Sequence, residues 1–313
     1  MGHEVKTSKV LATTTSFAKE SPDVLELLKK NKLDVVFNPL GRKLNEDELW
    51  ELLDEYKPLG MLAGTEPITS AVLQKAKAYL RAISRVGVGW DNVDKDAADM
   101  LGIQVYRTRG VLTQTVAELT IGLILSALRL IYFHDRLIRQ GQWEKRTGSL
   151  LQGKTVGIVG FGDIGQRVGE LISAFDGRVI YYDPEPISVS WAKAVSMSDL
   201  FARADIISIH ASGNKTIFGP EEFKACKQGA ILVNTARGEL VDENALHDAL
   251  VKGRVSFACL DVFEKEPYCG PLCSLDNVIL TPHIGSYARE ARHLMECTAV
   301  KNLIKGLHKA GFL

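Results

Sequence analysis

The sequence predicts an α/β protein with two doubly wound parallel-sheet domains, one of them inserted in the other. Two observations lead to this class. Short apolar runs alternate with amphipathic helical stretches from about residue 10 to 107, and the alternation returns from residue 155 to 280. Such alternation is typical of parallel sheets covered on both faces. The chain of 313 residues also exceeds the usual size of a single hydrophobic core, which favours two domains.

The first series of elements forms the predicted first domain. Its expected strands are 10–14, 35–38, 60–63, 82–86 and 104–106, and its expected helices are 22–30, 46–55, 70–77 and 95–100. Asn45, followed three residues later by Glu48, predicts a capping box at the start of the second helix. Thr69 is expected to cap the third helix.

The second series forms the predicted inserted domain. A long helical pattern at 113–140, which stops at Gly141, predicts one helix that bridges the domains. The expected strands that follow are 155–159, 179–182, 206–209, 230–233, 255–260 and 278–280, which predicts a six-stranded sheet. The tail at 286–307 is again helical and follows a turn that we interpret as a hinge, so we expect it to pack back on the first domain. The expected domains are therefore residues 1–107 with 286–313, and residues 108–285.

Charge and hydropathy exclude two classes of partner. The 38 basic residues balance 38 acidic ones, so no overall positive field attracts nucleic acid or an anionic membrane, and we expect neither partner. The longest apolar segment, 119–128, is half the length of about 20 residues that a membrane-spanning helix needs. The first residues contain no apolar signal region.

The cysteines indicate a reducing compartment. They number five, and only Cys269 and Cys273 lie close together in the sequence. The paired spacing of a zinc site is missing, so we expect ordinary reduced thiols and no metal site. This pattern fits a protein of the cytoplasm.

Residues 155–165 contain the most informative motif of the chain. An apolar strand leads into Gly160-x-Gly162-x-x-Gly165, a helical stretch follows, and Asp183 ends the next strand eighteen residues later. This order predicts a dinucleotide-binding βαβ unit, in which glycines let the backbone approach a pyrophosphate at a helix N-terminus. A carboxylate at Asp183 accepts hydrogen bonds from ribose hydroxyls and repels a 2′-phosphate, so the expected cofactor is NAD. A glycine-rich turn without a ligand is the alternative interpretation.

Three segments that each follow an expected strand supply candidate catalytic residues, namely Arg237, Glu266 and His283. Hydride removal from a 2-hydroxy acid needs a cation for the carboxylate, and the planar guanidinium of Arg237 suits that role. It also needs a base for the hydroxyl proton, for which His283 has a suitable pKa range. Glu266 is expected to hydrogen-bond the second imidazole nitrogen. Taken singly, the three residues have plainer interpretations as a surface ion pair, an exposed loop acid and a turn histidine.

The same three segments carry a resemblance to a known family. Residues 234–238 read Asn-Thr-Ala-Arg-Gly, residues 261–267 read Asp-Val-Phe-x-x-Glu-Pro, and residues 281–285 read Thr-Pro-His-Ile-Gly. With the glycine motif, they make the chain similar to the D-isomer-specific 2-hydroxyacid dehydrogenases over nearly its whole length. The resemblance implies a Rossmann NAD-binding domain inserted in a flavodoxin-like substrate domain. It also implies an NAD-dependent oxidoreductase that acts on the CH–OH group of a small 2-hydroxy acid, or on the 2-keto acid in reverse.

The resemblance assigns roles to individual residues. Arg237, Glu266 and His283 take the carboxylate-binding, histidine-partner and acid/base roles just derived. Further cofactor contacts are implied at Asp163, Ile164, His210, Ala211, Thr235, Ala236 and Asp261. Backbone N–H groups near Val88 and Gly89 are implied to meet the substrate carboxylate, although an ordinary glycine-rich turn also explains that loop. We further expect a homodimer, with Trp143 either at the subunit contact or in the core.

The chain departs from the family pattern at two places. Many relatives have Asn-x-Pro-Gly at the first crossing between domains, where this chain has Arg107-Thr108-Arg109-Gly110. The two arginines are either a solvent-facing basic hinge or an added attraction for an anionic substrate or cofactor phosphate. After His210 the expected proline is absent as well, which alters the loop on the adenine side.

The resemblance is greatest to a short branch related to phosphoglycerate dehydrogenase, and we expect no regulatory domain after Leu313. Ala63-Gly64 aligns with the Arg-Ser pair of true phosphoglycerate dehydrogenases. Phosphoglycerate, glyoxylate, hydroxypyruvate and larger 2-keto acids therefore all remain candidate substrates, and the physiological direction stays open. A formate- or phosphite-oxidising enzyme of the same fold and a non-enzymatic NAD-sensing corepressor are the alternative functions.

Overall fold

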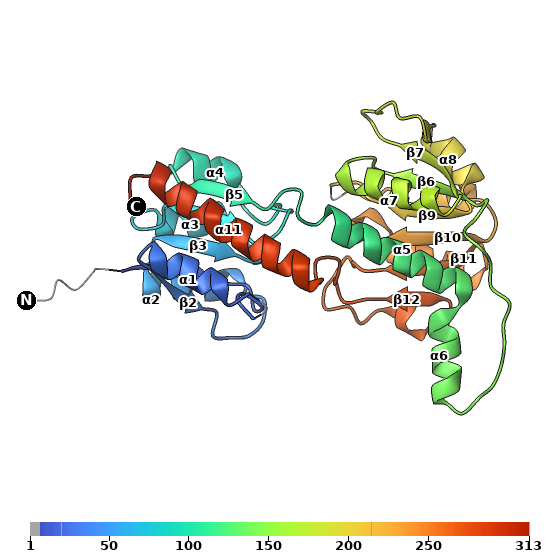
Figure 1. Ribbon diagram of the computed structural model, residues 1–313, viewed down its shortest axis with the longest axis horizontal. Coiled ribbons are helices and arrows are strands. Elements are labelled where there is room, and N and C mark those ends of the chain that lie inside the picture. The colour runs from blue at the N-terminus through green and yellow to red at the C-terminus, as the bar shows by residue number, and fades with distance from the viewer. Residues whose placement is uncertain (1–6, 20, 214, 313) are drawn as a thin grey trace, which may run out of the picture. The chain divides into compact units, whose positions relative to one another are not determined.

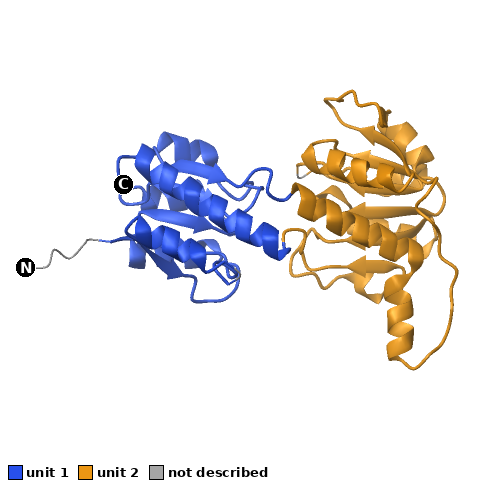
Figure 2. Ribbon diagram, in the orientation of Figure 1, with its two compact units in different colours: residues 1–112, 287–313 blue, residues 113–286 orange. Residues whose placement is uncertain are grey.

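The protein was analysed as a computed structural model, which describes residues 7–19, 21–213 and 215–312. The chain divides into two compact units (Figure 2). Unit 1 combines residues 1–112 with 287–313, and unit 2 comprises residues 113–286. The chain divides after residues 112 and 286, whereas the sequence predicted divisions after residues 107 and 285.

Among the described residues, unit 1 contains a five-stranded parallel sheet in the order β2-β1-β3-β4-β5. This is the strand order of flavodoxin-like sheets, as expected from the sequence. The strands are β1 (Ser8–Ala12), β2 (Leu33–Phe37), β3 (Gly60–Ala63), β4 (Ala82–Arg85) and β5 (Gln104–Arg107). The helices are α1 (Asp23–Lys30), α2 (Glu46–Tyr56), α3 (Ser70–Ala76), α4 (Lys95–Met100) and α11 (Arg289–Lys309).

Two hydrophobic cores cover the two faces of this sheet. One is formed by side chains from α2, α3 and α4, and the other by side chains from α1 and α11. The last helix, α11, crosses the sheet of unit 1 beside α1 (Figure 1). It buries Met295, Ala299, Leu303 and Leu307 there, which confirms that the tail packs back on the first domain.

The predicted helix caps of unit 1 are confirmed. The Asn45 side chain accepts from the backbone N–H of Glu48, and the Glu48 carboxylate accepts from the backbone N–H of Asn45. The Thr69 hydroxyl accepts from the N–H of Val72 at the start of α3. These contacts satisfy backbone donors that the first turn of a helix leaves without partners.

Within its described part, unit 2 contains a seven-stranded parallel sheet in the order β12-β11-β10-β9-β6-β7-β8. The strands are β6 (Thr155–Val159), β7 (Arg178–Tyr182), β8 (Ala192–Ala194), β9 (Ile206–Ile209), β10 (Ala230–Asn234), β11 (Val255–Leu260) and β12 (Val278–Leu280). The strand order reverses between β6 and β9, as in Rossmann domains. The prediction of six strands was wrong because it missed the short edge strand β8. Its three residues are half-buried or exposed, so no apolar run marks it.

The helices of unit 2 cover both faces of its sheet. They are α5 (Thr113–Arg129), α6 (Ile131–Arg139), α7 (Asp163–Ala174), α8 (Met197–Arg203), α9 (Pro220–Ala225) and α10 (Glu243–Val251), with short 3-10 turns at Gly238–Leu240 and Pro271–Ser274. Side chains from α5 and α7 join one core, and side chains from α8, α9 and α10 join the other.

The single long helix predicted at 113–140 is wrong. The chain breaks at Leu130, which adopts a left-handed conformation with φ of 53°. The axes of α5 and α6 therefore bend by 65°. Among the described residues no single helix is long and apolar enough to span a membrane, although this bent pair passes the same test by length and composition.

Candidate active site

The sheet of unit 2 places the glycine motif at its point of reversal. Strands β6 and β9 are neighbours, and the chain leaves them in opposite directions across the sheet. Ligands of doubly wound sheets bind beyond the carboxyl ends of the strands at this point. The loops at the carboxyl ends of β6 and β9 contain Gly160 and Ala211, whose backbones lie against each other.

The glycines of the motif permit close backbone contacts. Gly160 has φ of 90°, and a Cβ atom added there would lie 2.5 Å from the nitrogen of Ala211. A Cβ on Gly165 would lie 2.2 Å from the oxygen of Gly160. Both distances are below any normal contact, so any larger residue forces these loops apart. The glycines therefore set the tight turn between β6 and α7.

The N-terminus of α7 suits a pyrophosphate. The helix begins after Gly162, which has no side chain to cap the first backbone N–H groups. Gly162 and Asp163 are exposed and Ile164 is half-buried. Uncapped N–H groups and the helix dipole together form an anion-binding site.

Asp183 lies beside the glycine loop. It follows β7 directly, and its Oδ2 accepts a hydrogen bond of 2.7 Å from the backbone N–H of Phe161 in the glycine loop. Its Oδ1 accepts from the N–H of Glu185 at 3.0 Å. The carboxylate is therefore held beside the glycine loop, with lone pairs left to accept from hydroxyl groups. The glycine turn, the helix N-terminus and this carboxylate together fit an adenine dinucleotide.

The other residues predicted to contact the cofactor lie on the same edge of the sheet. His210 follows β9, and burial lowers the pKa of its imidazole to about 3, so the ring is neutral. Its Nε2 lies 2.8 Å from the hydroxyl of Ser208. Thr235 follows β10, and its hydroxyl is 3.0 Å from that of Thr120 on α5. These contacts orient the loops that the cofactor is expected to touch.

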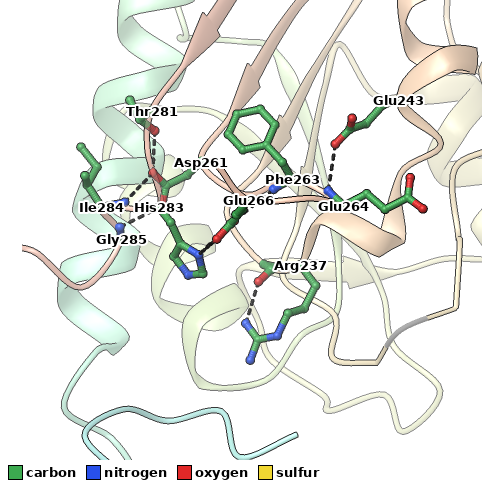
Figure 3. Close-up of polar contacts among 11 residues, drawn as sticks. Arg237, Glu243, Asp261, Phe263, Glu264, Glu266, Thr281, His283, Ile284 and Gly285 are labelled. Carbon is green, nitrogen blue, oxygen red and sulfur yellow. Dashed lines mark hydrogen bonds and ion pairs between the residues drawn. The ribbon is translucent and has the colours of Figure 1, made fainter. Parts of the chain in front are cut away.

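His283 and Glu266 form a hydrogen-bonded pair (Figure 3). The Nδ1 atom of His283 lies 3.0 Å from Oε2 and 3.1 Å from Oε1 of Glu266. The hydrogen bond to Glu266 raises the pKa of His283 above its usual value, against the opposing effect of burial. The ring is half exposed, and its Nε2 is the nitrogen that does not contact Glu266.

The carboxylate of Asp261 holds the loop that carries His283 (Figure 3). Asp261 is 1% exposed. Its Oδ1 accepts from the Thr281 hydroxyl and, at 2.8 Å, from the N–H of Ile284, and its Oδ2 accepts from the N–H of Gly285 at 2.8 Å. His283 has φ of 54°, which a non-glycine residue rarely adopts unless its surroundings enforce it. Asp261 supplies that enforcement.

Arg237 lies on a turn that packs against the loop of Glu266. The side chain of Asn234 donates to the oxygen of Arg237 at 2.8 Å and accepts from the N–H of Ala236 at 3.0 Å, which closes the turn. A Cβ on Gly238 would lie 1.9 Å from the carbonyl carbon of Phe263, so the two loops touch through backbone. The positive charge of Arg237 acts to lower the pKa of His283, which places the two side chains in electrostatic range.

Sequence reasoning missed two residues that position this site. The sequence motif gives Asn234 no role of its own, although an asparagine that ends a strand is a common turn former. Glu243 begins α10, and its Oε1 accepts from the N–H of Glu264 at 2.9 Å, which anchors the loop of Glu266 (Figure 3). No local sequence pattern predicts this contact, because the two residues meet only in the folded unit.

The loop of Val88 and Gly89 follows β4 in unit 1. Arg107 donates to the oxygen of Val88 at 3.2 Å, and its guanidinium lies 4.2 Å from the centre of the Trp90 ring. Arg107 is half-buried and Arg109 is exposed, so the two arginines differ in environment. Arg107 thus supports the loop, which neither of its sequence-based interpretations included.

Comparisons with known proteins identify relatives of the whole chain. Residues 121–285 match the family model "D-isomer specific 2-hydroxyacid dehydrogenase, NAD binding domain". The chain is 38% identical to a hydroxypyruvate reductase from Thermotoga maritima, covering 90% of this chain and 93% of the relative. It is 36% identical to a D-3-phosphoglycerate dehydrogenase from Archaeoglobus fulgidus, covering 92% of this chain but only 56% of the relative.

A solved structure agrees with these matches. The crystal structure of a glyoxylate reductase from Paecilomyes thermophila aligns with a TM-score of 0.86 at 29% identity, covering 98% of this chain and 97% of the other. Both parallel sheets, the NAD-binding domain and the full-length relatives lead to one conclusion. The chain belongs to the D-isomer specific 2-hydroxyacid dehydrogenase family, and it is an NAD(H)-dependent oxidoreductase that acts on CH–OH donors.

Proposed function

We propose that this enzyme reduces a small unphosphorylated 2-keto acid, such as glyoxylate or hydroxypyruvate, to the 2-hydroxy acid, with the D configuration where the product is chiral. The observation that carries this proposal is the His283–Glu266 pair, held near Arg237 on the sheet edge that also carries the glycine loop. A proton donor, a carboxylate-binding cation and a dinucleotide site are the parts that this reaction requires.

The three residues have separate tasks in the proposed reaction. Arg237 binds the substrate carboxylate through its guanidinium. His283 donates the proton on Nε2 to the keto oxygen in reduction and takes it back in oxidation. Glu266 holds Nδ1 and stabilises the imidazolium before the transfer. The glycine loop, the α7 N-terminus and Asp183 hold NADH, which supplies the hydride when bound.

The substrate class rests on unit 1 and on the relatives. Gly64 donates its backbone N–H to the Glu66 carboxylate at 3.0 Å, and Glu66 is 1% exposed. The resemblance implies an Arg-Ser pair in true phosphoglycerate dehydrogenases where this chain has Ala63-Gly64, and the buried Glu66 carboxyl lies beside that position. Burial raises the pKa of Glu66. Relatives matched along most of their length include reductases of hydroxypyruvate and glyoxylate. We propose that backbone N–H groups of Val88 and Gly89 assist in binding the acid.

The pH dependence of reduction tests the Glu266 role. Because Glu266 raises the pKa of His283, the protonated donor persists to higher pH, and reduction is lost only as pH rises through that raised pKa. Glu266→Gln removes the charged partner, so the fall in kcat/KM for reduction should move to lower pH, with roughly a tenfold loss at neutral pH. The profile of kcat/KM against pH checks this expectation. Coincident profiles for the variant and the parent enzyme would show that Glu266 does not take part in the mechanism.

The position of Asp183 predicts a preference for NADH over NADPH. A 2′-phosphate would lie close to its carboxylate, and such like-charge contacts cost several kcal/mol, so we expect a ratio of kcat/KM of about 100 or more. Asp183→Ala should reduce this ratio, chiefly by improving use of NADPH. The comparison requires steady-state rates with both cofactors. Equal use of both by the parent enzyme would reject the assignment of Asp183.

We also propose that the enzyme is a homodimer whose contact includes α6 and the segment that follows it. Trp143 is 83% exposed and Leu150 is 64% exposed, and Ile131 on α6 is 55% exposed. Residues 138–150 are all exposed, and large apolar side chains that stand clear of the chain's own core mark a candidate interaction surface. Trp143→Glu should therefore shift the mass measured by light scattering from dimer to monomer. Met100→Glu, at an equally exposed apolar site in unit 1, is the control that should stay dimeric. A monomeric parent protein would contradict the proposal.

We place the enzyme in the cytoplasm, as the cysteine pattern predicts. Cys226, Cys259, Cys269, Cys273 and Cys297 are all free thiols in the described structure. Free thiols of this number suit a reducing compartment.

A further inference from the structure

Three side chains of types that can bind metal ions lie together in unit 1, in a cluster that the proposed reaction does not use. Asp23 is the first residue of α1, and His293 and Cys297 lie one turn apart on α11. Their ligand atoms all lie within 4.8 Å of one another. Figure 1 shows α1 and α11 side by side on one face of the sheet. Asp23 and His293 are about half exposed, so a hydrated ion has access to them.

The distances among these atoms suit a tetrahedral zinc ion. The Sγ atom of Cys297 lies 3.7 Å from Nε2 of His293 and 3.9 Å from Oδ2 of Asp23. A tetrahedral site with normal zinc–sulfur, zinc–nitrogen and zinc–oxygen bonds separates such ligand atoms by about 3.5 to 3.6 Å. The separation of the Asp23 and His293 ligand atoms is within 4.8 Å, so binding requires the three side chains to move closer together by rotation.

The imidazole of His293 is already oriented by its other nitrogen. Its Nδ1 lies 3.1 Å from the hydroxyl of Ser21, which is 0% exposed, and 3.5 Å from Oδ1 of Asp23. When Nδ1–H donates to the Ser21 hydroxyl, Nε2 carries the free lone pair and lies 3.7 Å from Sγ of Cys297. Metal-binding histidines are commonly fixed in this way by a hydrogen bond from the second ring nitrogen.

We propose that Asp23, His293 and Cys297 form a zinc(II) site that joins the first and last helices of unit 1, with water as the fourth ligand. The ligand set of one thiolate, one imidazole and one carboxylate matches the preference of zinc for sulfur and nitrogen with oxygen as a further donor. The thiol releases its proton to solvent when the ion binds. The sequence predicted no metal site because Asp23 lies far from the other two ligands along the chain. This zinc site is independent of the proposed reduction chemistry.

Metal titration of the untagged full-length protein tests the proposal. Cys269 and Cys273 are exposed thiols in unit 2, so the parent for this experiment carries Cys269→Ser and Cys273→Ser. Calorimetric titration of the metal-free parent with zinc should give one ion per chain. Cobalt(II) should give a thiolate-to-cobalt charge-transfer absorption in the near ultraviolet. Zinc should also raise Tm of the parent, because it binds the folded chain.

Added to this parent, Cys297→Ala and His293→Ala should each weaken zinc binding at least tenfold, and Cys297→Ala should abolish the cobalt absorption. Asp23→Asn should weaken binding less, because an amide oxygen still faces the ion. NADH oxidation by all variants should equal that of the parent, so this test stands apart from that of the proposed function. Zinc binding of unchanged affinity in Cys297→Ala and His293→Ala would overturn the proposal, as would failure of the parent to take up one zinc ion.

Discussion

Replacing His283 by Ala should lower kcat for keto-acid reduction by about 10²- to 10⁴-fold, the usual effect of removing a positioned acid/base group. The imidazole is the group whose pKa the Glu266 hydrogen bond raises, so it is protonated over a wider pH range than a free histidine. Binding of NADH should change little, because the glycine loop and Asp183 hold that molecule in the proposal. Steady-state rates and a fluorescence titration with NADH measure the two effects separately.

A second histidine of the same unit provides a control for the His283→Ala result. His247 lies on α10 of the same unit beside Asp248 and is not part of the His283–Glu266 pair. His247→Ala should retain the parent rate within about twofold, since surface substitutions usually have small effects. An undiminished kcat in His283→Ala would reject His283 as the proton donor.

Replacing Arg237 by Ala should raise KM for the keto acid by about 100-fold or more, with a smaller change in KM for NADH. Hydrogen bonds to charged groups contribute about 1.5–3 kcal/mol each, and the guanidinium forms two with a carboxylate. Arg237→Lys should recover only part of the loss, because an ammonium group lacks the planar fork. Arg237 should also act on the pH profile, since its charge lowers the pKa of His283 and its removal lets that pKa rise.

An arginine elsewhere on the same sheet controls for general effects. Arg178 begins β7, at the end of that strand opposite to the candidate site, and it is exposed. Arg178→Ala should leave KM for the keto acid unchanged. An unchanged KM in Arg237→Ala would show that another group binds the carboxylate.

The fold follows from the sequence wherever burial dictates the pattern. Strands such as β6 and β9 lie in the centre of the sheet and read as short apolar runs, so their positions were predictable. Edge strand β8 is short and carries an exposed lysine, so no pattern marks it. The break at Leu130 was equally hidden, because a leucine in a left-handed conformation lacks the glycine or proline that normally signals a helix end.

The residue types of the candidate site were predictable from the sequence. The hydrogen bonds that hold its loops were less so. Parallel strands bring their carboxyl ends to one edge, which is why Arg237, Glu266 and His283 were expected to meet. The contacts that hold them depend on loop conformation. Asp261 was expected to touch the cofactor, and the structure shows its carboxylate engaged by the His283 loop. The anchoring of the Glu266 loop by Glu243 likewise arises only in three dimensions.

The most direct test of the central claim is the oxidation of NADH across a panel of 2-keto acids, with the configuration of each chiral product determined by chiral chromatography. The panel contains glyoxylate, hydroxypyruvate, 3-phosphohydroxypyruvate and a larger branched 2-keto acid. The account predicts the highest kcat/KM for glyoxylate or hydroxypyruvate, D-glycerate as the product from hydroxypyruvate, and loss of turnover in His283→Ala. Preference for the phosphorylated acid, an L product, or turnover of formate or phosphite with NAD while every 2-keto acid fails would contradict it.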